Sequence, residues 1–382
     1  MTLVYLIAGE SSGDVLGARL LAAMRAKAPG IRAAGIGGDR LAEQGMASLF
    51  PMRDLALMGL MEVLPNIRRL ARRLDETVAD ITARRPDVVV TIDSPGFTSR
   101  IAKRIRPLGI PIVHYVAPQI WGWRAWRVKE IAQQMDRLLC LLPFEPPMFL
   151  AAGLDARFVG HPVLESGAET GDAARFRAQH GIGPDERVVL VMPGSRRTEI
   201  TRMLPVFAEA LRLAETRVPG LRPVVPLAGP VEAAVRAATA SWSPAPILVT
   251  TLADKHDAFA AASAGLIKSG TSSLEVAMAG VPMLIGYKVN WLTGEILRRI
   301  ATAKYAAIVN LLADAPIIPE FLQERCTPAL LADALVELLT DPAIGAVQVA
   351  GARDLLDRLR PPGGGSPSEA AADAVLGVLA KP

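Results

Sequence analysis

The chain has 382 residues, which is too long for one ordinary domain, and its 51% hydrophobic and 21% charged residues exclude general disorder. Two cysteines, Cys140 and Cys326, exclude a disulfide framework and a cysteine-based zinc site. The formal net charge is +4, and residues 1–165 carry the basic excess with 21 Lys and Arg against 16 Asp and Glu, which suits nucleic acid, anionic membrane or phosphorylated ligands.

Apolar runs alternate with helical stretches along the first 160 residues. The opening run, residues 3–8, has no basic stretch before it, which predicts a buried strand and no signal peptide. No apolar run reaches the ~18 residues of a membrane-spanning helix, so none is expected. Strands are predicted at 3–8, 33–36, 88–92, 112–115 and 138–142, and helices at 15–27, 63–84 and 125–134. This alternation predicts a parallel α/β sheet.

The alternation of apolar runs and helical stretches is interrupted around residues 159–163 and then begins again. Further strands are predicted at 188–192, 223–227, 247–249, 265–267 and 282–285, and helices at 200–216 and 274–279. We therefore expect two Rossmann-like domains joined near residues 160–185. A Pro- and Gly-rich linker at 361–367 precedes a last helix at 368–380.

Two strand-to-helix loops rich in Gly and Ser are candidates for binding phosphate. Such loops lie at the carboxyl edge of a parallel sheet, where backbone amides and a helix N-terminus attract anions. Residues 268–272 offer small hydroxyl groups that suit a diphosphate. Residues 193–196 end in Arg196, whose guanidinium matches phosphate oxygens in pairs. Plain helix starts remain open for both, because Ser272 with Glu275 matches a capping box and Arg196 fits a helix surface.

A third loop, residues 9–14, follows the first strand. It carries the acids Glu10 and Asp14 where a P-loop carries lysine, which favours contacts with hydroxyl groups or a leaving-group environment. The chain has neither a G-x-G-x-x-G fingerprint nor a Walker A motif, so neither a dinucleotide site nor an NTPase site is indicated.

Asp93 is the candidate general base. It ends the strand at 88–92, and a carboxylate at the carboxyl end of a central strand could take a proton from an attacking hydroxyl. Capping of the helix that begins at Pro95, by Asp93 or Ser94, explains the same residues equally well. His114 and His161 stand alone, and lone histidines are more often structural. No H-x-H, C-x-x-C, H-E-x-x-H or D-x-D spacing occurs, so no metal site is expected.

Apolar and basic residues are clustered in two stretches of the N-terminal half. The first holds the apolar residues Met58, Leu60, Met61, Val63 and Leu64, followed by Arg68, Arg69, Arg72 and Arg73. The arginine spacing places all four on one helical face. The second holds Trp121 and Trp123 among further arginines. Both suit a membrane surface or an acylated, phosphorylated ligand. A buried stretch beside a solvated helix face is the plain alternative, and nucleic acid is disfavoured because no nucleic-acid motif accompanies the modest charge.

The order and spacing of these motifs resemble the lipid-A-disaccharide synthase family nearly from end to end. The motifs are residues 8–14, 58–59 with 62–64, 115–118 with 121–124, 158–162, 193–196, 269–271 with 274–275, and 310–313. Any one of them is weak, and together they are strong.

The resemblance implies a GT-B fold, with two Rossmann-like domains facing a central cleft. Residues 1–163 would face the acceptor and the membrane, residues 186–344 would bind the UDP-sugar, and a C-terminal helix at about 345–382 would pack back on the first domain. The implied enzyme is an inverting glycosyltransferase that needs no metal or cofactor. It would condense UDP-2,3-diacylglucosamine with 2,3-diacylglucosamine 1-phosphate into a β-1,6-linked lipid A disaccharide phosphate and UDP. It would be peripheral on the cytoplasmic face of the inner membrane of Gram-negative bacteria.

The resemblance also implies roles for individual residues. Asp93 resembles the base for the acceptor 6-hydroxyl, and Glu10 lies in a motif near the reacting groups. The donor site would comprise Gly194, Ser195, Arg196, Ser269, Gly270, Thr271, Ser272, Glu275 and Asn310, with Glu275 on the ribose hydroxyls. The apolar residues 58–64 would meet acyl chains or the membrane. The family carries a further Asp and an Asn after the aspartate, whereas this chain has Ser94, Gly96 and Thr98, so any contact those side chains make is lost here.

Two other functions remain as hypotheses. A UDP-N-acetylglucosamine 2-epimerase uses a similar two-domain fold and would turn over a soluble UDP-sugar without an acyl-binding surface. A non-catalytic membrane-surface module with a relic nucleotide site would turn over nothing, although the presence of both Asp93 and the phosphate loops disfavours it.

Overall fold

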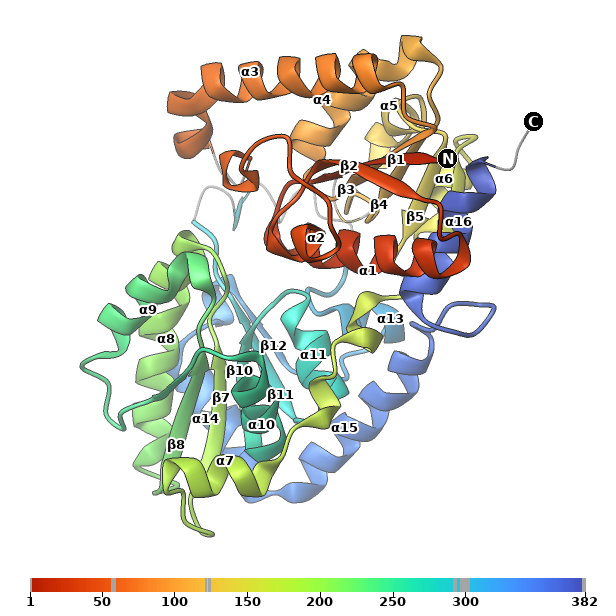
Figure 1. Ribbon diagram of the computed structural model, residues 1–382. Helices are drawn as coiled ribbons and strands as arrows, with labels where there is room; N and C mark the ends of the chain where they lie inside the picture. Colours follow the sequence, from red (N-terminus) through yellow and green to blue (C-terminus); the bar gives the residue numbers. More distant parts are fainter. Residues whose placement is uncertain are drawn as a thin grey trace. The chain divides into compact units, whose positions relative to one another are not determined.

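The computed structural model describes residues 2–55, 60–120, 122, 125–290, 294–295 and 303–379. The chain forms two compact units, Met1–Glu165 with Leu359–Pro382, and Ser166–Arg358. Each unit has a parallel sheet with helices packed on it, which confirms the predicted α/β class (Figure 1).

The sheet of the first unit is built from the predicted apolar runs. Its spatial order is β2-β1-β3-β4-β5-β6, and all neighbouring strands are parallel. All five residues of β3 are buried, as expected for a central strand covered on both faces. The strands are β1 (Leu3–Ala8), β2 (Arg32–Ile36), β3 (Val88–Ile92), β4 (Ile112–Tyr115), β5 (Arg137–Cys140) and β6 (Asp155–Phe158).

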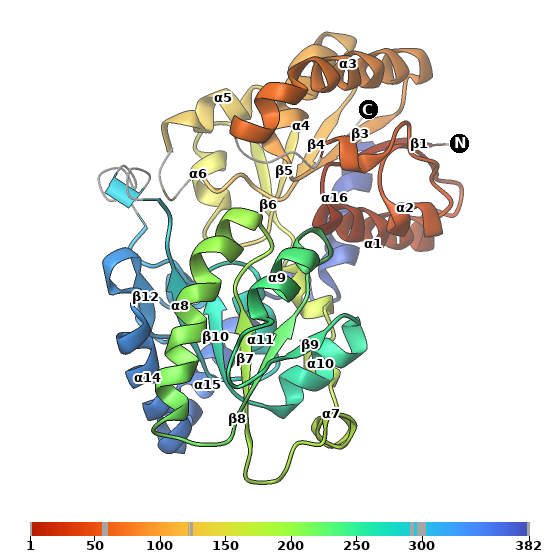
Figure 2. The same cartoon turned by 90° about the vertical axis from the view of Figure 1, so that its left-hand side faces the viewer.

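Helices cover both faces of this sheet (Figures 1 and 2). Alternate residues of β1 divide between the two faces, because successive side chains of a strand point to opposite sides. Val4 and Leu6 pack with α1 and α16, whereas Tyr5 and Ile7 pack with the face that holds α3 and α4. The helices are α1 (Ser11–Lys27), α2 (Asp39–Glu43), α3 (Leu60–Arg84), α4 (Pro95–Ile105), α5 (Val128–Ala132), α6 (Pro146–Leu150) and α16 (Pro367–Leu379).

The second unit repeats this layered arrangement. Its sheet runs in the order β12-β11-β10-β7-β8-β9, with all neighbouring strands parallel. Val189 and Val191 of β7 pack with α8 and α14, and Val188 packs on the opposite face with α7 and α10. The strands are β7 (Arg187–Met192), β8 (Leu221–Pro226), β9 (Ile247–Val249), β10 (Ala262–Lys268), β11 (Met283–Tyr287) and β12 (Glu320–Leu322). The helices are α7 (Ala173–His180), α8 (Arg197–Glu215), α9 (Glu232–Thr239), α10 (Leu252–Ala261), α11 (Ser272–Met278), α13 (Ile308–Ala313), α14 (Pro328–Thr340) and α15 (Pro342–Asp357).

The sequence pattern does not predict the edge strands β6 and β12. Each has a single neighbour in its sheet. β6 carries the charged residues Asp155 and Arg157, and β12 has three residues, so neither shows a continuous apolar run. Two helices begin earlier than predicted. α1 begins at Ser11 and not at residue 15, and α8 begins at Arg197 and not at residue 200, so the loops before them are shorter.

The C-terminal segment that packs on the first unit is shorter than expected. α15 belongs to the second unit, because Ala352 and Leu355 are buried there and the Gln348 side chain bonds to the backbone of Met283 in β11. The chain joins the first unit from Leu359 onward, and α16 lies beside α1 (Figure 1). The fully buried Arg137 of β5 ties α16 to the sheet by donating from its Nη1 to the Ala374 carbonyl.

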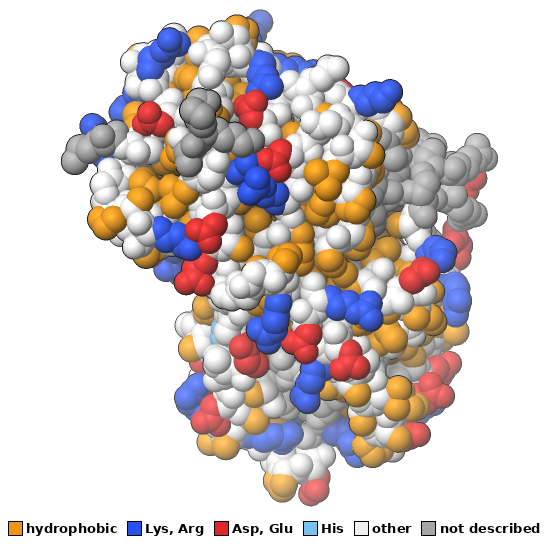
Figure 3. All heavy atoms as spheres, turned by 90° about the vertical axis from the view of Figure 1, so that its right-hand side faces the viewer, with side chains coloured by type: hydrophobic (Ala, Val, Ile, Leu, Met, Phe, Trp, Pro, Cys, Tyr) orange, Lys and Arg blue, Asp and Glu red, His pale blue; other side chains and the backbone are white. Residues whose placement is uncertain are grey.

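Within the described residues, no helix combines the length and the apolar character needed to cross a membrane. On the face drawn in Figure 3, the basic and acidic side chains of the described residues are interspersed.

Candidate active site

The first candidate edge lies at the carboxyl ends of β1, β3 and β4. Ala8 pairs with Ile92, and Ile92 pairs with Tyr115, so the segments that follow these three strands are neighbours. The loop that begins with Gly9 and Glu10 therefore lies at the same end of the sheet as Asp93, as the parallel-sheet prediction requires.

Asp93 is partly exposed, and neither it nor Ser94 caps α4 through its side chain. Ser94 is the N-cap residue of α4 and makes no side-chain cap bond. The Thr98 hydroxyl donates to the carbonyls of Asp93 and Ser94, both at 3.0 Å. Asp93 Oδ1 accepts from the Ser94 amide at 2.7 Å, which fixes the carboxylate at the strand end. The capping hypothesis for Asp93 is therefore wrong.

The backbone at this edge is strained in three places. Asp93 and Ser94 have φ values of 51° and 47°, and Val116, which follows β4, has a φ of 82°. A β-branched residue rarely adopts positive φ, and such strain concentrates at functional sites. Gly9 permits the close packing beside Ser94, because a Cβ on Gly9 would lie 2.3 Å from Ser94 Oγ. Ser94, which stands where the family carries a different side chain, thus packs tightly against Gly9 at this edge.

The acids of the first loop have different roles. Asp14 is buried within α1, and its carboxylate accepts from the amides of Gly38, Arg40 and Leu41 at 2.7, 2.9 and 3.2 Å. It holds the start of α2, so the expectation that Asp14 contacts a ligand hydroxyl is wrong. Glu10 is the N-cap residue of α1 and stays partly exposed at the sheet edge. Only Glu10 remains a candidate from this loop.

The second candidate edge lies at the carboxyl ends of β7 and β10. These strands are neighbours, with Met192 paired to Ile267, so the loops 193–196 and 268–271 lie side by side. The two phosphate-binding candidates, which are more than 70 residues apart in the sequence, thus share one edge of one sheet.

Glu199 joins these two loops. Its Oε2 accepts from the Ser195 and Arg196 amides at 3.1 and 3.3 Å, and its Oε1 lies 3.2 Å from Arg196 Nη1 and 2.9 Å from Lys268 Nζ. Gly194, with a φ of 115°, leaves room for this carboxylate, because a Cβ there would lie 2.3 Å from Oε2. Burial opposes the charged form, yet Lys268, Arg196 and the Ser195 amide hold the pKa of Glu199 below its usual range.

The loop after β10 starts a helix without a capping box. Thr271 is the N-cap residue and makes no side-chain cap bond, and Ser272 is the first residue of α11. Glu275 instead pairs with Lys255 at 2.8 Å. The plain capping explanation for Ser272 and Glu275 is therefore wrong, and both the Thr271 hydroxyl and the Ser272 hydroxyl lie in partly or fully exposed residues.

Asn310 supports this loop from behind. Its side chain is fully buried, donates to the Ile318 carbonyl and to Glu320 Oε1, and accepts from the Ile318 amide. Glu320 in turn accepts from the amides of residues 306 and 307, and the Ala306 carbonyl accepts from Ser269 Oγ at 2.7 Å. This arrangement does not fit direct binding of the sugar-nucleotide donor by Asn310. We infer that Asn310 instead holds the segment whose backbone accepts from Ser269.

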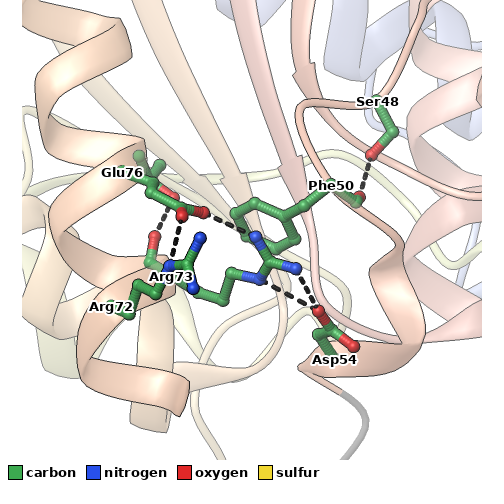
Figure 4. A network of polar contacts seen from close by, with 7 residues as sticks. Ser48, Phe50, Asp54, Arg72, Arg73 and Glu76 are labelled. Carbon is green, nitrogen blue, oxygen red and sulfur yellow. Dashed lines mark hydrogen bonds and ion pairs between the residues drawn. The ribbon is translucent and has the colours of Figure 1, made fainter. Parts of the chain in front are cut away.

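The arginines of α3 do not all face solvent, because Arg73 packs against the segment that holds Phe50 and Asp54 (Figure 4). Arg73 donates to Asp54 and Glu76 and lies 4.6 Å over the Phe50 ring, so it braces α3 against the segment before it. It is three residues after Leu70 and four before the buried Thr77, on the packed side of the helix. The expectation that Arg73 faces the membrane is therefore wrong.

Arg68, Arg69 and Arg72 are exposed, and Arg72 pairs with Glu76. The neighbouring Ile67 is 53% exposed. Met58, Trp121 and Trp123 lie outside the described residues, as do the side chains of Leu60, Met61, Val63 and Leu64. The described part of this surface thus combines one exposed apolar residue with three exposed arginines.

The two lone histidines of the first unit are structural. Burial lowers the pKa of both His114 and His161 to about 4, and both rings are therefore neutral near pH 7. His114 bonds to Thr91 at 2.7 Å, and His161 Nδ1 accepts from the Val163 amide. Among the described residues, no three or more His, Cys, Asp or Glu side chains are grouped closely enough to hold a metal ion.

Comparison with known proteins identifies the family of this chain. A family model described as Lipid-A-disaccharide synthetase matches residues 4–370. The chain belongs to the lipid-A-disaccharide synthetase family. This membership makes the protein a glycosyltransferase of lipid A biosynthesis, which confirms the resemblance and decides against the epimerase hypothesis.

Curated lipid-A-disaccharide synthases are similar over nearly the whole chain. The relative from Granulibacter bethesdensis is 52% identical over 387 residues, covering 99% of this chain and 98% of its own. The relative from Rickettsia felis is 38% identical and covers 100% and 98%. The family therefore applies to both units of the protein.

Solved structures show the GT-B fold. A UDP-N-acetylglucosamine 2-epimerase from Neisseria meningitidis, bound to UDP-N-acetylglucosamine, has a TM-score of 0.65 at 13% identity and covers 99% of both chains. A spinosyn rhamnosyltransferase complexed with thymidine diphosphate has a TM-score of 0.60 at 14% identity and covers 100% of both. At this identity the likeness shows the fold alone.

Sequence patterns assign no role to two charged residues, Glu199 and Lys268, at the carboxyl edge of β7 and β10 in this member of the lipid-A-disaccharide synthetase family. Glu199 stands three residues after Arg196, which is the spacing of an N3 acid in a capping box, and its carboxylate accepts from the amide of the N-cap residue Arg196 as such an acid does. Lys268 is the last residue of β10 and begins the predicted loop 268–272, but the small hydroxyl groups of that loop suggest the phosphate contact and leave the lysine without a role. A charged residue at either end of a buried strand is the signal that would have found it.

Proposed function

We propose that the protein transfers the diacylglucosamine unit of UDP-2,3-diacylglucosamine to 2,3-diacylglucosamine 1-phosphate. The products are a β-1,6-linked lipid A disaccharide phosphate and UDP. The observation that carries this proposal is the Asp93 carboxylate, which the Ser94 amide fixes at the carboxyl end of β3. The Thr98 hydroxyl donates to the carbonyls of Asp93 and Ser94 and so holds the same turn.

The chemistry is an inverting displacement. The acceptor 6-hydroxyl oxygen attacks C1 of the donor sugar from the side opposite UDP, the C1–O bond to the diphosphate breaks, and Asp93 takes the hydroxyl proton. An α-linked donor thereby gives a β-linked product. The departing UDP carries the negative charge, which cationic side chains and fixed dipoles can stabilise without a metal ion.

The donor would lie at the carboxyl edge of β7 and β10. Arg196 offers a half-exposed guanidinium, and Thr271 and Ser272 offer hydroxyl groups to the diphosphate. Glu275, held by Lys255, is available to the ribose hydroxyls through its remaining lone pairs. Glu10 contributes a carboxylate beside Asp93 on the first unit, where it can accept from hydroxyl groups of the acceptor sugar.

The acylated substrates imply contact with a membrane surface, which we place on the cytoplasmic face of the inner membrane. The exposed Ile67 and the arginines Arg68, Arg69 and Arg72 of α3 support this placement, because basic residues beside apolar ones bind anionic lipid surfaces at roughly 1 kcal/mol per charge. The double substitution Arg68→Glu/Arg69→Glu should reduce co-sedimentation with anionic vesicles. Arg236→Glu/Arg325→Glu, a matched change at exposed sites of the second unit, should not, and equal losses would refute the placement.

A transfer assay tests the proposed reaction. Purified protein in detergent is mixed with both substrates and EDTA, and mass spectrometry follows the tetraacyl disaccharide phosphate while a coupled assay follows UDP. We expect product and UDP in equal amounts, with the new linkage β by NMR. An α linkage, a requirement for added metal, or release of UDP without disaccharide would contradict the proposal.

A further inference from the structure

Part of the backbone at the donor edge is already engaged. The Ser195 and Arg196 amides before α8 donate to Glu199 Oε2. α11, which follows the other loop, is a short helix of seven residues. Cationic side chains at this edge would therefore add to the positive charge that a diphosphate needs.

Among the described residues, Arg196 and Lys268 are the cations paired with Glu199 at this edge, and they differ in their exposure to solvent. The Arg196 side chain is 51% exposed, whereas that of Lys268 is 14% exposed. Both are paired with one carboxylate, Glu199, so the three side chains carry a net positive charge. Water and salt screen an exposed charge more strongly than a buried one. The attraction between Lys268 and a neighbouring anion is therefore screened less than that between Arg196 and the same anion.

Lys268 is held where the two loops meet. It ends β10, one residue after Ile267, which pairs with Met192 at the end of β7. Its Nζ lies 2.9 Å from Glu199 Oε1 and 4.9 Å above the centre of the Tyr287 ring. It also reaches the glycine of the second loop, because a Cβ on Gly270 would lie 3.5 Å from Nζ. Lysines are almost never fully buried unless they are paired, and Glu199 is the partner that keeps the Lys268 ammonium at this position.

We infer that Lys268 is a donor-binding residue whose ammonium contacts the diphosphate of the nucleotide, and that Glu199 positions it. The Glu199 carboxylate and the Tyr287 ring fix the ammonium between the loops, and an ammonium has three N–H donors, so it can bond to phosphate oxygen while it stays paired with Glu199. This inference rests on the proposed function, since it assumes that the donor edge binds a nucleoside diphosphate.

Calorimetry with UDP and saturation-transfer NMR with uridine test the inference on the full-length chain. Lys268→Met removes the charge and keeps a long apolar stem over Tyr287. We expect UDP to bind about ten- to hundredfold more weakly, because a hydrogen bond to a charged group is lost, and uridine to bind unchanged. Lys268→Arg keeps the charge and should retain most of the UDP affinity. Lys304→Met, which removes an exposed, Asp314-paired ammonium of the same unit, should change neither.

The outcomes separate the inference from the proposed function. If the unmodified protein does not bind UDP, the donor assignment and the inference both fail. If it binds UDP and Lys268→Met binds UDP equally well, the inference alone is refuted, and an equal weakening for UDP and uridine would show a merely structural role. Should Lys268→Met fold poorly, Lys268→Met/Glu199→Gln removes both charges of the pair, and it must show the same selective loss for UDP.

Discussion

The ion pair beneath α16 allows the cost of burying a charge to be predicted from its surroundings. The Arg137 side chain is 2% exposed and donates to Asp155 Oδ2 from Nε and Nη2 at 2.8 and 2.6 Å. Asp155 is 32% exposed and has a second partner, Arg157, at 3.0 Å. Asp155→Ala leaves a buried guanidinium without its carboxylate and should cost about 3–5 kcal/mol. Arg137→Met leaves a carboxylate that keeps Arg157 and some water, and should cost about 1–3 kcal/mol.

Hydrogen exchange and calorimetry measure this asymmetry. The free energy of unfolding of the first unit should fall more in Asp155→Ala than in Arg137→Met. The backbone amides of residues 368–379 in α16 should lose protection in both variants, because Arg137 also holds the Ala374 carbonyl. Asp333→Ala, at an exposed pair with Arg217 in the second unit, is the control and should change stability by less than about 1 kcal/mol. Equal costs for the two test variants, or a larger cost for Arg137→Met, would refute the reasoning.

Three further predictions follow from other buried or paired groups. The pKa of His114 is about 4 in the folded chain and 6.5 in the unfolded chain, so the unfolded chain takes up the proton at a higher pH. The free energy of unfolding should therefore fall as the pH drops from 6.5 to 4. In urea titrations, His114→Gln should reduce this dependence of the free energy of unfolding on pH. Asn310→Leu should lower the melting temperature and also weaken UDP binding through Ser269, and calorimetry showing normal UDP affinity would contradict the support role. Arg73→Ala should destabilise the first unit, whereas Arg68→Ala should not, as thermal unfolding will show.

The central strands and both candidate edges could be predicted from the sequence, because hydrophobic periodicity and Gly- and Ser-rich loops are local signals. Residues 3–8, 88–92 and 112–115 are strands with the predicted bounds. The edge strand β12 could not be predicted, because it has three residues and owes its pairing to β11, not to its own pattern.

Roles that depend on tertiary contacts were beyond the sequence. Arg73 follows the same spacing as Arg68 and Arg72, yet Asp54 and Phe50, from a preceding segment, turn it into a brace. Asp14 and Asn310 look like polar site residues, and only the buried partners around them show that they support the backbone. Glu199 and Lys268 are 69 positions apart and become one feature only when β7 and β10 pair.

The turnover of Asp93→Asn tests the central claim most directly. Asparagine keeps an oxygen for the Ser94 amide, so the strained turn and the fold should be retained while the proton acceptor is lost. We predict that kcat for disaccharide formation falls about 10²- to 10⁴-fold while the affinity for UDP stays unchanged. Turnover within a few-fold of the unmodified protein would contradict the assignment of Asp93 as the general base.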